Sequence, residues 1–296
     1  MNYTSIADLA NTIRRNAWKV PYDISLIVGI PRSGMMAAIM LGEQLHKPVQ
    51  TLAEFLEPLP LRMGGRSKHM RDLRGKVLVL DDTCYTGRTM ENIKEEIKRT
   101  ARWNIDVACD NILYGCIYAE GRSAKDYVDI WLEDNYNEHE ELWHLYEWNI
   151  LHHGKRLSEV CMFDMDGVLC KEPPDERNQR DYERYIADAI PMVLPTTKIG
   201  AIVTFRMEKY RKVTEEWLHR YGIENKHLIM ASEEWQRTNA VAASFKAREY
   251  RLATWAKLFV ESSAKQAHEI ALLTGKQVYC YENGIMYWYG YTICSW

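Results

Sequence analysis

Short apolar runs alternate with longer amphipathic stretches along the whole chain. Continuous apolar runs of four to eight residues predict buried strands. In the first half they fall at residues 25–30, 76–81, 112–119 and 128–133, and in the second half at 160–164, 201–205, 227–230, 258–261 and 277–281. Between them, helical spacing of apolar positions predicts helices at residues 4–16, 34–46, 89–102, 181–189, 208–221, 241–256 and 264–274. This alternation is typical of an α/β fold with mostly parallel sheets flanked by helices.

The length of the chain, 296 residues, favours two domains. A polar stretch, His152-His153-Gly154-Lys155-Arg156, is the best boundary, so we predict domains at residues 1–152 and 157–296. Apolar residues make up 47% of the chain, enough for two cores. The formal charge of −3 provides no global basic field, so we do not expect nucleic acid as a partner.

The expected location is cytoplasmic. No run of about 18 apolar residues predicts a membrane span, and the first residues lack a charged start followed by an apolar core, as a secretory signal would have. The seven cysteines form no C-x-x-C pair, which is typical of a reducing compartment rather than a disulfide framework.

The segment VLVLDDTCYTGRTM at residues 77–90 carries the first candidate chemistry. An apolar strand ends in Asp81 and Asp82, and a turn rich in Thr and Gly leads into a helix. Backbone N–H groups at such a turn, helped by the hydroxyls of Thr83, Thr86 and Thr89 and by close approach at Gly87, suit a phosphate monoester. The two acids suit sugar hydroxyls or Mg²⁺. A sugar 5-phosphate meets both requirements.

This segment resembles the phosphoribosyl-pyrophosphate (PRPP) signature of type I phosphoribosyltransferases. The resemblance implies that PRPP and Mg²⁺ bind at Asp81, Asp82, Thr83, Thr86, Gly87 and Thr89. The alternative is an ordinary strand-to-helix turn with capping threonines, but a cap needs one such residue, not this set.

Further elements of that family have candidates nearby. Gly29–Gly34 (GIPRSG) follows a strand and implies pyrophosphate contacts by Arg32 and Ser33. The family also has a flexible loop that closes over the reacting centre, and residues 57–75, which carry a basic run, occupy its place here. Arg66 and Lys68 are candidates for the cationic side chain that helps pyrophosphate to leave. Residues 128–133 and Trp143–Trp148 are candidates for the variable hood that grips the acceptor. There Trp131 either stacks on a planar base or belongs to the core.

The segment VCMFDMDGVL at residues 160–169 carries the second candidate chemistry. Asp164 and Asp166 are two residues apart at a strand end, so both point to the same side. One carboxylate can attack phosphorus while the other handles the leaving-group proton. The segment resembles motif I of the haloacid dehalogenase (HAD) superfamily.

Three later positions resemble the remaining HAD motifs, in order: Thr204 as the phosphate-binding hydroxyl, Lys246 as the motif III lysine, with Lys257 as runner-up, and Glu261 as the motif IV acid. The resemblance implies Mg²⁺ at Asp164, Asp166 and Glu261. Many members have a second acid after Glu261, whereas this chain has Ser262, so we expect Asp164 and Glu261 to share the ion with waters.

The insert after the DMDGV motif is too short for a large cap, which predicts an open site or a small lid. Arg206, Lys209 and Arg211 follow Thr204; they either attract phosphate or are surface charges of a helix, the second being favoured. The tail at residues 287–296 matches neither family, and is a packing strand or a contact in a homo-oligomer.

The whole chain resembles a fusion of a type I phosphoribosyltransferase with a HAD phosphatase, as met in phage and bacterial genomes. The leading hypothesis is transfer of 5-phosphoribosyl from PRPP to an unknown acceptor, a nucleobase, nucleoside or other small molecule, followed by removal of the 5-phosphate through an aspartyl-phosphate. One alternative is uncoupled nucleobase salvage, of orotate or a purine, beside a general nucleotide phosphatase. Another is a PRPP-sensing regulator without transfer activity, because fold alone does not fix function.

Overall fold

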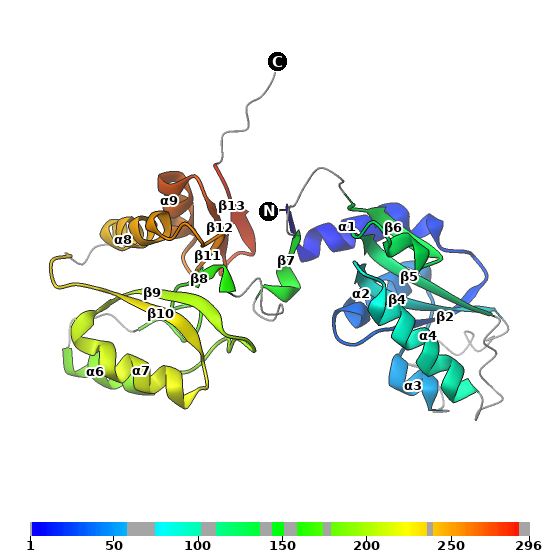
Figure 1. The fold of residues 1–296 in the computed structure, drawn as a ribbon, viewed down its shortest axis with the longest axis horizontal. Coiled ribbons are helices and arrows are strands. Elements are labelled where there is room, and N and C mark those ends of the chain that lie inside the picture. Colours follow the sequence, from blue (N-terminus) through cyan, green and yellow to red (C-terminus); the bar gives the residue numbers. More distant parts are fainter. Residues whose placement is uncertain are drawn as a thin grey trace, which may run out of the picture. The chain divides into compact units, whose positions relative to one another are not determined.

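The computed structural model describes residues 2–57, 75–101, 111–136, 144–150, 159–173, 179–235 and 239–289. The chain divides into two compact units (Figure 1). We call Ile6–Leu142 the N-terminal unit, and Met1–Ser5 together with Trp143–Trp296 the C-terminal unit. Both are α/β with mostly parallel strands, as the sequence predicted. The polar stretch at residues 152–156, the basic run with Arg66 and Lys68, and residues 290–296 lie outside the described residues.

The sheet of the N-terminal unit is parallel throughout its described strands. In spatial order these are β3 (Val49–Thr51), β2 (Ile24–Gly29), β4 (Lys76–Cys84), β5 (Ile112–Ala119) and β6 (Ile130–Asp134). The helices are α1 (Ile6–Asn16), α2 (Ser33–Leu45), α3 (Leu52–Leu56) and α4 (Arg88–Ala101), with short 3-10 turns η1 (Ala17–Lys19) and η3 (Ala124–Asp126). β2 and β4 are neighbours inside the sheet. Because they are parallel, their carboxyl ends lie next to each other at the same end of the sheet.

The sheet has apolar side chains on both faces, and helices cover both faces. On one face Val28, Val79 and Cys116 pack in one cluster with Met90 and Ile93 of α4. α1 and α2 contact the strands β2, β4 and β5 through a second set of buried residues. Burying a side chain such as Val or Ile contributes about 1.5–3 kcal/mol, so the sheet is held from both sides.

The C-terminal unit is built on a second sheet, in which β12 and β13 are antiparallel and the other described neighbours are parallel. Its order is β10 (Asn225–Ala231), β9 (Ile199–Met207), β8 (Cys161–Phe163), β11 (Leu258–Glu261), β12 (Gln277–Cys280) and β13 (Ile285–Tyr287). Its helices are α6 (Gln179–Asp188), α7 (Arg211–Arg220), α8 (Asn239–Leu252) and α9 (Ala264–Thr274), with η4 (Glu147–Asn149) and η5 (Glu208–Tyr210). α8 and α9 lie on one side of the sheet, and α6 and α7 on the other (Figure 1).

A small two-stranded sheet joins the chain start to the C-terminal unit. β1 (Asn2–Thr4) pairs in parallel with β7 (His144–Tyr146), and the Tyr3 hydroxyl donates a 2.8 Å hydrogen bond to the carbonyl of Gly284. The contacts of residues 1–5 and 143–150 therefore group them with the C-terminal unit, although the sequence placed them in the first domain. The described part of the candidate hood at Trp143–Trp148 belongs to the same unit.

Long elements match the predicted ranges closely, while short or broken ones differ. The helix predicted at residues 241–256 ends at Leu252, and the one predicted at 208–221 begins with a 3-10 turn before α7. The three-residue strands β3 and β13 were not predicted. Three residues show no periodicity, so their strand state depends on pairing with a neighbour.

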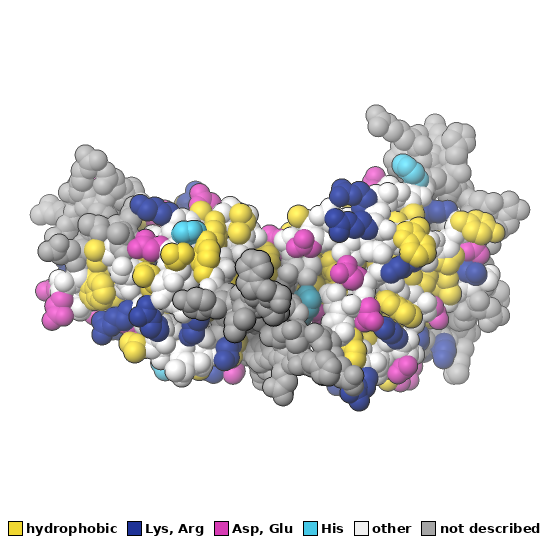
Figure 2. Space-filling model, turned by 90° about the horizontal axis from the view of Figure 1, so that it is seen from above, with side chains coloured by type: hydrophobic (Ala, Val, Ile, Leu, Met, Phe, Trp, Pro, Cys, Tyr) yellow, Lys and Arg dark blue, Asp and Glu magenta, His cyan; other side chains and the backbone are white. Residues whose placement is uncertain are grey.

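Charges of both signs are interspersed with scattered apolar side chains on the visible face of each unit (Figure 2). Among the described residues, none of the helices combines the length and apolar character that crossing a bilayer requires.

Candidate functional site

In the N-terminal unit two strand-to-helix turns meet at a pair of acids. β2 leads into α2 and β4 leads into α4, both from the same edge of the sheet. Ser33, the first residue of α2, donates a 2.9 Å hydrogen bond from Oγ to Oδ1 of Asp82. An added Cβ on Gly34 would lie 2.8 Å from Oδ1 of Asp81, so glycine is needed for this close approach. The peptide between Pro31 and Arg32 is cis.

Asp81 and Asp82 lie side by side, and Asp82 is only 3% exposed. The backbone N–H of Asp82 donates to Oδ1 of Asp81 at 2.9 Å. Burial, with the neighbouring charge of Asp82, raises the pKa of Asp81 to about 8. Among the described residues no salt bridge joins Asp81 to a basic side chain. Asp81 can therefore interact with a cation or with hydroxyl donors of a ligand.

Two threonine hydroxyls lie near the N-terminus of α4, in and just after the turn that follows β4. Thr86 and Thr89 are exposed around the N-terminus of α4, where unpaired N–H groups favour an anion. Gly87 has a φ of +76°, and an added Cβ would lie 2.0 Å from the ring of Tyr127. Both the backbone conformation and the space therefore require glycine.

Trp131 packs rather than projecting freely. It is half-buried against the core cluster of β4, β5 and α4, and the Lys125 ammonium lies 5.4 Å from its ring centre. These contacts favour the packing alternative over base stacking. The exposed Arg32 lies on the turn after β2, as the sequence placed it.

In the C-terminal unit a single buried ammonium joins four elements. Lys246 Nζ on α8 donates to Oδ2 of Asp164, after β8, at 2.8 Å, and to Oε2 of Glu261, the last residue of β11, at 2.7 Å. Its third bond, of 3.1 Å, goes to Oε1 of Gln266 on α9. Asp164 is 4% exposed and Glu261 is fully buried. The structure therefore brings Lys246 together with Asp164 and Glu261, whereas Lys257, the runner-up, is exposed.

The buried carboxylates of Asp164 and Glu261 repel each other, and the positive charge of Lys246 reduces this repulsion. Burial and the negative charge of Glu261 raise the pKa of Asp164. Burial alone would lower the pKa of Lys246, but Asp164 and Glu261 offset it and the pKa is raised. The ammonium of Lys246 therefore offsets part of the cost of charging Asp164, although the pKa of Asp164 stays raised.

Asp166 has a partner that the sequence did not predict. Arg206 Nε donates to Oδ2 of Asp166 at 2.9 Å, and Nη2 to Oδ1 at 2.6 Å, in a two-pronged salt bridge. Arg206 lies on β9 and is 2% exposed, so its interpretation as a helix-surface charge was wrong. Of its companions, Lys209 is exposed, and Arg211 pairs with Glu208.

Two polar side chains complete the surroundings of Asp164. Thr204 is 1% exposed, and its Oγ1 accepts a 3.2 Å hydrogen bond from the backbone N–H of Arg206. Ser262 Oγ lies 3.5 Å from Oδ2 of Asp164 and donates to Oε1 of Glu172 at 3.1 Å. Glu172 was not identified from the sequence, because it lies in an irregular stretch without a motif.

The oxygen-rich donor set suits Mg²⁺ by charge, although it is not a ready-made cage. Asp164, Asp166, Glu172 and Glu261 carry four formal negative charges against the two positive charges of Lys246 and Arg206, leaving a formal excess of −2. Within the described ranges no group of three or more His, Cys, Asp or Glu is arranged to hold a metal. Arg206 engages Asp166, and Lys246 engages both Asp164 and Glu261. Asp164 and Glu261 present carboxylate oxygens of the kind that Mg²⁺ prefers, and in this structure the ammonium of Lys246 bridges them.

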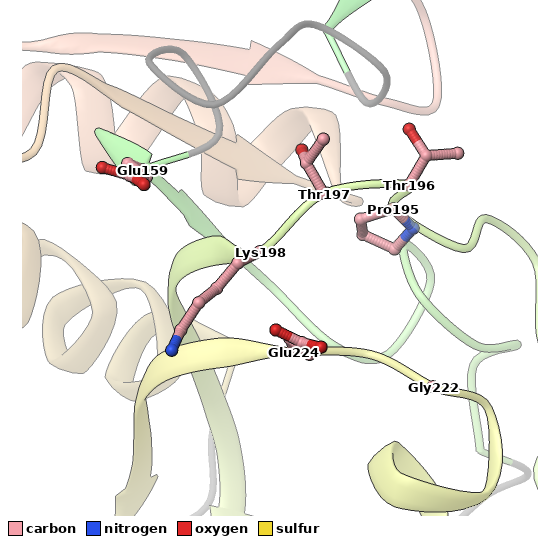
Figure 3. Close-up of a pocket in the computed structure, with 7 residues that line it drawn as sticks. All are labelled: Glu159, Pro195, Thr196, Thr197, Lys198, Gly222 and Glu224. Carbon is pink, nitrogen blue, oxygen red and sulfur yellow. The ribbon is translucent and has the colours of Figure 1, made fainter.

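A surface hollow lies at the opposite end of the second sheet (Figure 3). Its volume is about 460 Å³, and its lining comes from the segments that precede β8, β9 and β10. The lining residues are Glu159, Pro195, Thr196, Thr197, Lys198, Gly222 and Glu224. None belongs to the predicted chemistry, which lies at the carboxyl ends of the strands.

No protein-family model and no curated protein matches the sequence. Solved structures similar to half of the chain include a purine phosphoribosyltransferase from Pyrococcus horikoshii Ot3, with 19% identity, 50% of this chain and 95% of that chain covered, and a TM-score of 0.34. A xanthine-guanine-hypoxanthine phosphoribosyltransferase from Helicobacter pylori has 15% identity, 50% and 92% coverage, and a TM-score of 0.34. A hypothetical protein from Neisseria gonorrhoeae with bound ppGpp has 17% identity, 51% and 90% coverage, and a TM-score of 0.36. Because these TM-scores are low, we base the proposed function on the two sites.

Substituting Asp81→Asn should remove a pH dependence of stability. With a folded pKa of about 8 and an unfolded value of 3.8, the folded wild type holds a proton that the unfolded chain releases. Its stability therefore falls as pH rises from about 4 to 8, by up to about 1.4 kcal/mol per pH unit. Urea unfolding with hydrogen exchange of β4 peptides, at pH 5 to 8, should show a flatter profile for the variant. Parallel profiles would contradict this.

Substituting Arg206→Met should destabilise the C-terminal unit by about 3–5 kcal/mol, because it leaves the Asp166 carboxylate without its partner. The double variant Arg206→Met with Asp166→Asn should recover much of that loss. Urea unfolding of the four proteins in a double-mutant cycle gives the coupling. Additive losses would show that the pair is not coupled.

Proposed function

We propose that the chain is a bifunctional enzyme, a PRPP-dependent phosphoribosyltransferase joined to a HAD-type phosphomonoesterase. The N-terminal unit transfers 5-phosphoribosyl to a small-molecule acceptor such as a nucleobase or nucleoside. The C-terminal unit removes the 5-phosphate through an aspartyl-phosphate on Asp164. The observation that carries the proposal is that each unit has an acid pair at the carboxyl end of its parallel strands, where α/β proteins bind ligands. Both acids lie on β4 in the N-terminal unit, and they come from the ends of the neighbouring strands β8 and β11 in the C-terminal unit.

The acid pair and the two turns support the transfer half. Asp81 and Asp82 accept the ribose hydroxyls, and the turn from Thr83 to Thr89 receives the 5-phosphate at the start of α4. Ser33, tied to Asp82, and Arg32 lie on the turn assigned to pyrophosphate. Mg²⁺ bound with PRPP would supply positive charge to the departing pyrophosphate.

The lysine-bridged carboxylates support the phosphatase half. Asp164 attacks phosphorus, the P–O bond to the leaving group breaks, and water then attacks the aspartyl-phosphate to release inorganic phosphate. Lys246 fixes the orientation of Asp164, and Thr204 lies ready to donate to a phosphate oxygen. Asp164 and Glu261 would hold Mg²⁺, which offsets negative charge on the phosphate. Asp166 serves the proton transfers of the leaving group and the water.

The two half-reactions connect chemically, because the first makes a phosphomonoester and the second cleaves one. The net result is ribosylation of the acceptor, and the loss of phosphate makes the first step hard to reverse. Cytoplasmic location and a homo-oligomeric state are part of the same expectation.

Substituting Asp164→Asn should make a 5-phosphorylated product accumulate. Asparagine has nearly the same shape but cannot form the acyl phosphate, so phosphatase turnover should fall at least 10³-fold, the scale of losing a nucleophile. The measurement is product analysis by mass spectrometry after incubating PRPP, Mg²⁺ and a panel of bases, nucleosides and polyols. Glu216→Gln, exposed on α7, is the matched control. Identical end products from Asp164→Asn and wild type would contradict the coupling.

Substituting Asp82→Asn should weaken the transfer half alone. Removing a carboxylate that accepts ribose hydroxyls should lower pyrophosphate release from PRPP by about 10- to 100-fold, while hydrolysis of ribose 5-phosphate stays unchanged. Pyrophosphate and phosphate assays on the same samples separate the two activities. Unchanged pyrophosphate release would remove the N-terminal acids from the mechanism.

A further inference from the structure

Glu172 is an acid of the C-terminal site to which the proposed mechanism gives no role. Its Oε1 accepts the 3.1 Å hydrogen bond from Ser262. An added Cβ on Gly167 would lie 2.6 Å from the same Oε1 atom and 2.5 Å from Cβ of Ser262. The carboxylate of Glu172 therefore lies against the turn that carries Asp164 and Asp166.

Its surroundings differ from those of the other acids. Asp164 and Glu261 share Lys246, and Asp166 is clamped by Arg206. Glu172 forms no salt bridge within the described part of the chain, and the hydrogen bond that it accepts comes from the neutral hydroxyl of Ser262. It is also exposed, whereas Asp164 and Glu261 are buried. Glu172 is thus an exposed residue at the rim of the site, whose carboxyl group lies against Gly167 and Ser262 and is buried enough to raise its pKa.

Such a carboxylate can contact a substrate favourably through the part that is not phosphate. It repels the phosphate dianion, which the site attracts with Lys246 and Mg²⁺. A carboxylate accepts about four hydrogen bonds, and one position is taken by Ser262. Hydroxyls of a sugar can fill the others, and hydrogen bonds to a charged acceptor are stronger than neutral ones. An aryl leaving group offers no such donor.

We propose that Glu172 is a specificity-determining residue that accepts hydrogen bonds from hydroxyls of the leaving group and so favours sugar phosphates over phosphate esters without hydroxyls. The inference rests on the proposed phosphatase activity of this unit. It deepens that activity by assigning selection of the polyol part to a residue outside the reacting centre.

The test compares two substrates with the full-length protein and Mg²⁺. Ribose 5-phosphate carries hydroxyls, and phenyl phosphate carries none. Glu172→Ala should lower kcat/KM for ribose 5-phosphate by about 10- to 100-fold, the effect of one or two charged hydrogen bonds. Its kcat/KM for phenyl phosphate should stay the same or rise, because repulsion of the phosphate is removed. Glu172→Gln keeps one acceptor oxygen and should fall between wild type and Glu172→Ala.

The phenyl phosphate rate reports whether each variant is folded, and Glu216→Gln controls for loss of a surface charge. An equal loss on both substrates would overturn the inference, because a merely structural role lowers every rate alike. No loss on either substrate would overturn it as well. A wild type that hydrolyses neither ester overturns the proposed function, and the inference with it.

Discussion

The C-terminal site depends on one buried ammonium shared by two buried carboxylates. Lys246 lies within 2.8 Å of oxygens of both Asp164 and Glu261, and all three side chains are almost completely removed from water. Removing one partner of such a group leaves an uncompensated buried charge, which is strongly destabilising. The same contacts tie α8 to the ends of β8 and β11, so the packing of these elements and the position of the Asp164 carboxyl group have a common cause.

The acids of the N-terminal unit differ in their charge partners. No basic side chain forms a salt bridge with Asp81 among the described residues, and burial together with the neighbouring charge of Asp82 raises the pKa of Asp81 to about 8. A site of this kind gains its compensating charge from what it binds, whereas the C-terminal site carries much of its own. In the function that we propose, the substrate of the N-terminal unit would bring Mg²⁺ with it, whereas Asp164 of the C-terminal unit has the ammonium of Lys246 beside it.

Local patterns in the sequence predicted the long elements and the residues at strand ends. Asp81, Asp82, Asp164 and Glu261 each follow an apolar run, so their place at the edge of a parallel sheet could be predicted from periodicity. Arg206 and Glu172 could not, because their roles come from contacts 40 and 90 residues away, with Asp166 and Ser262. The strand β1 likewise depends on pairing with β7, 140 residues along the chain, which no local pattern reports.

The most direct test of the central claim, that Asp164 is a nucleophile held ready by Lys246, is ¹⁹F NMR of the full-length protein with beryllium fluoride and Mg²⁺. Beryllium fluoride adds to a reactive carboxylate as a phosphate mimic. The account predicts bound fluoride resonances in the wild type that disappear in Asp164→Asn. The same resonances in both proteins would contradict it.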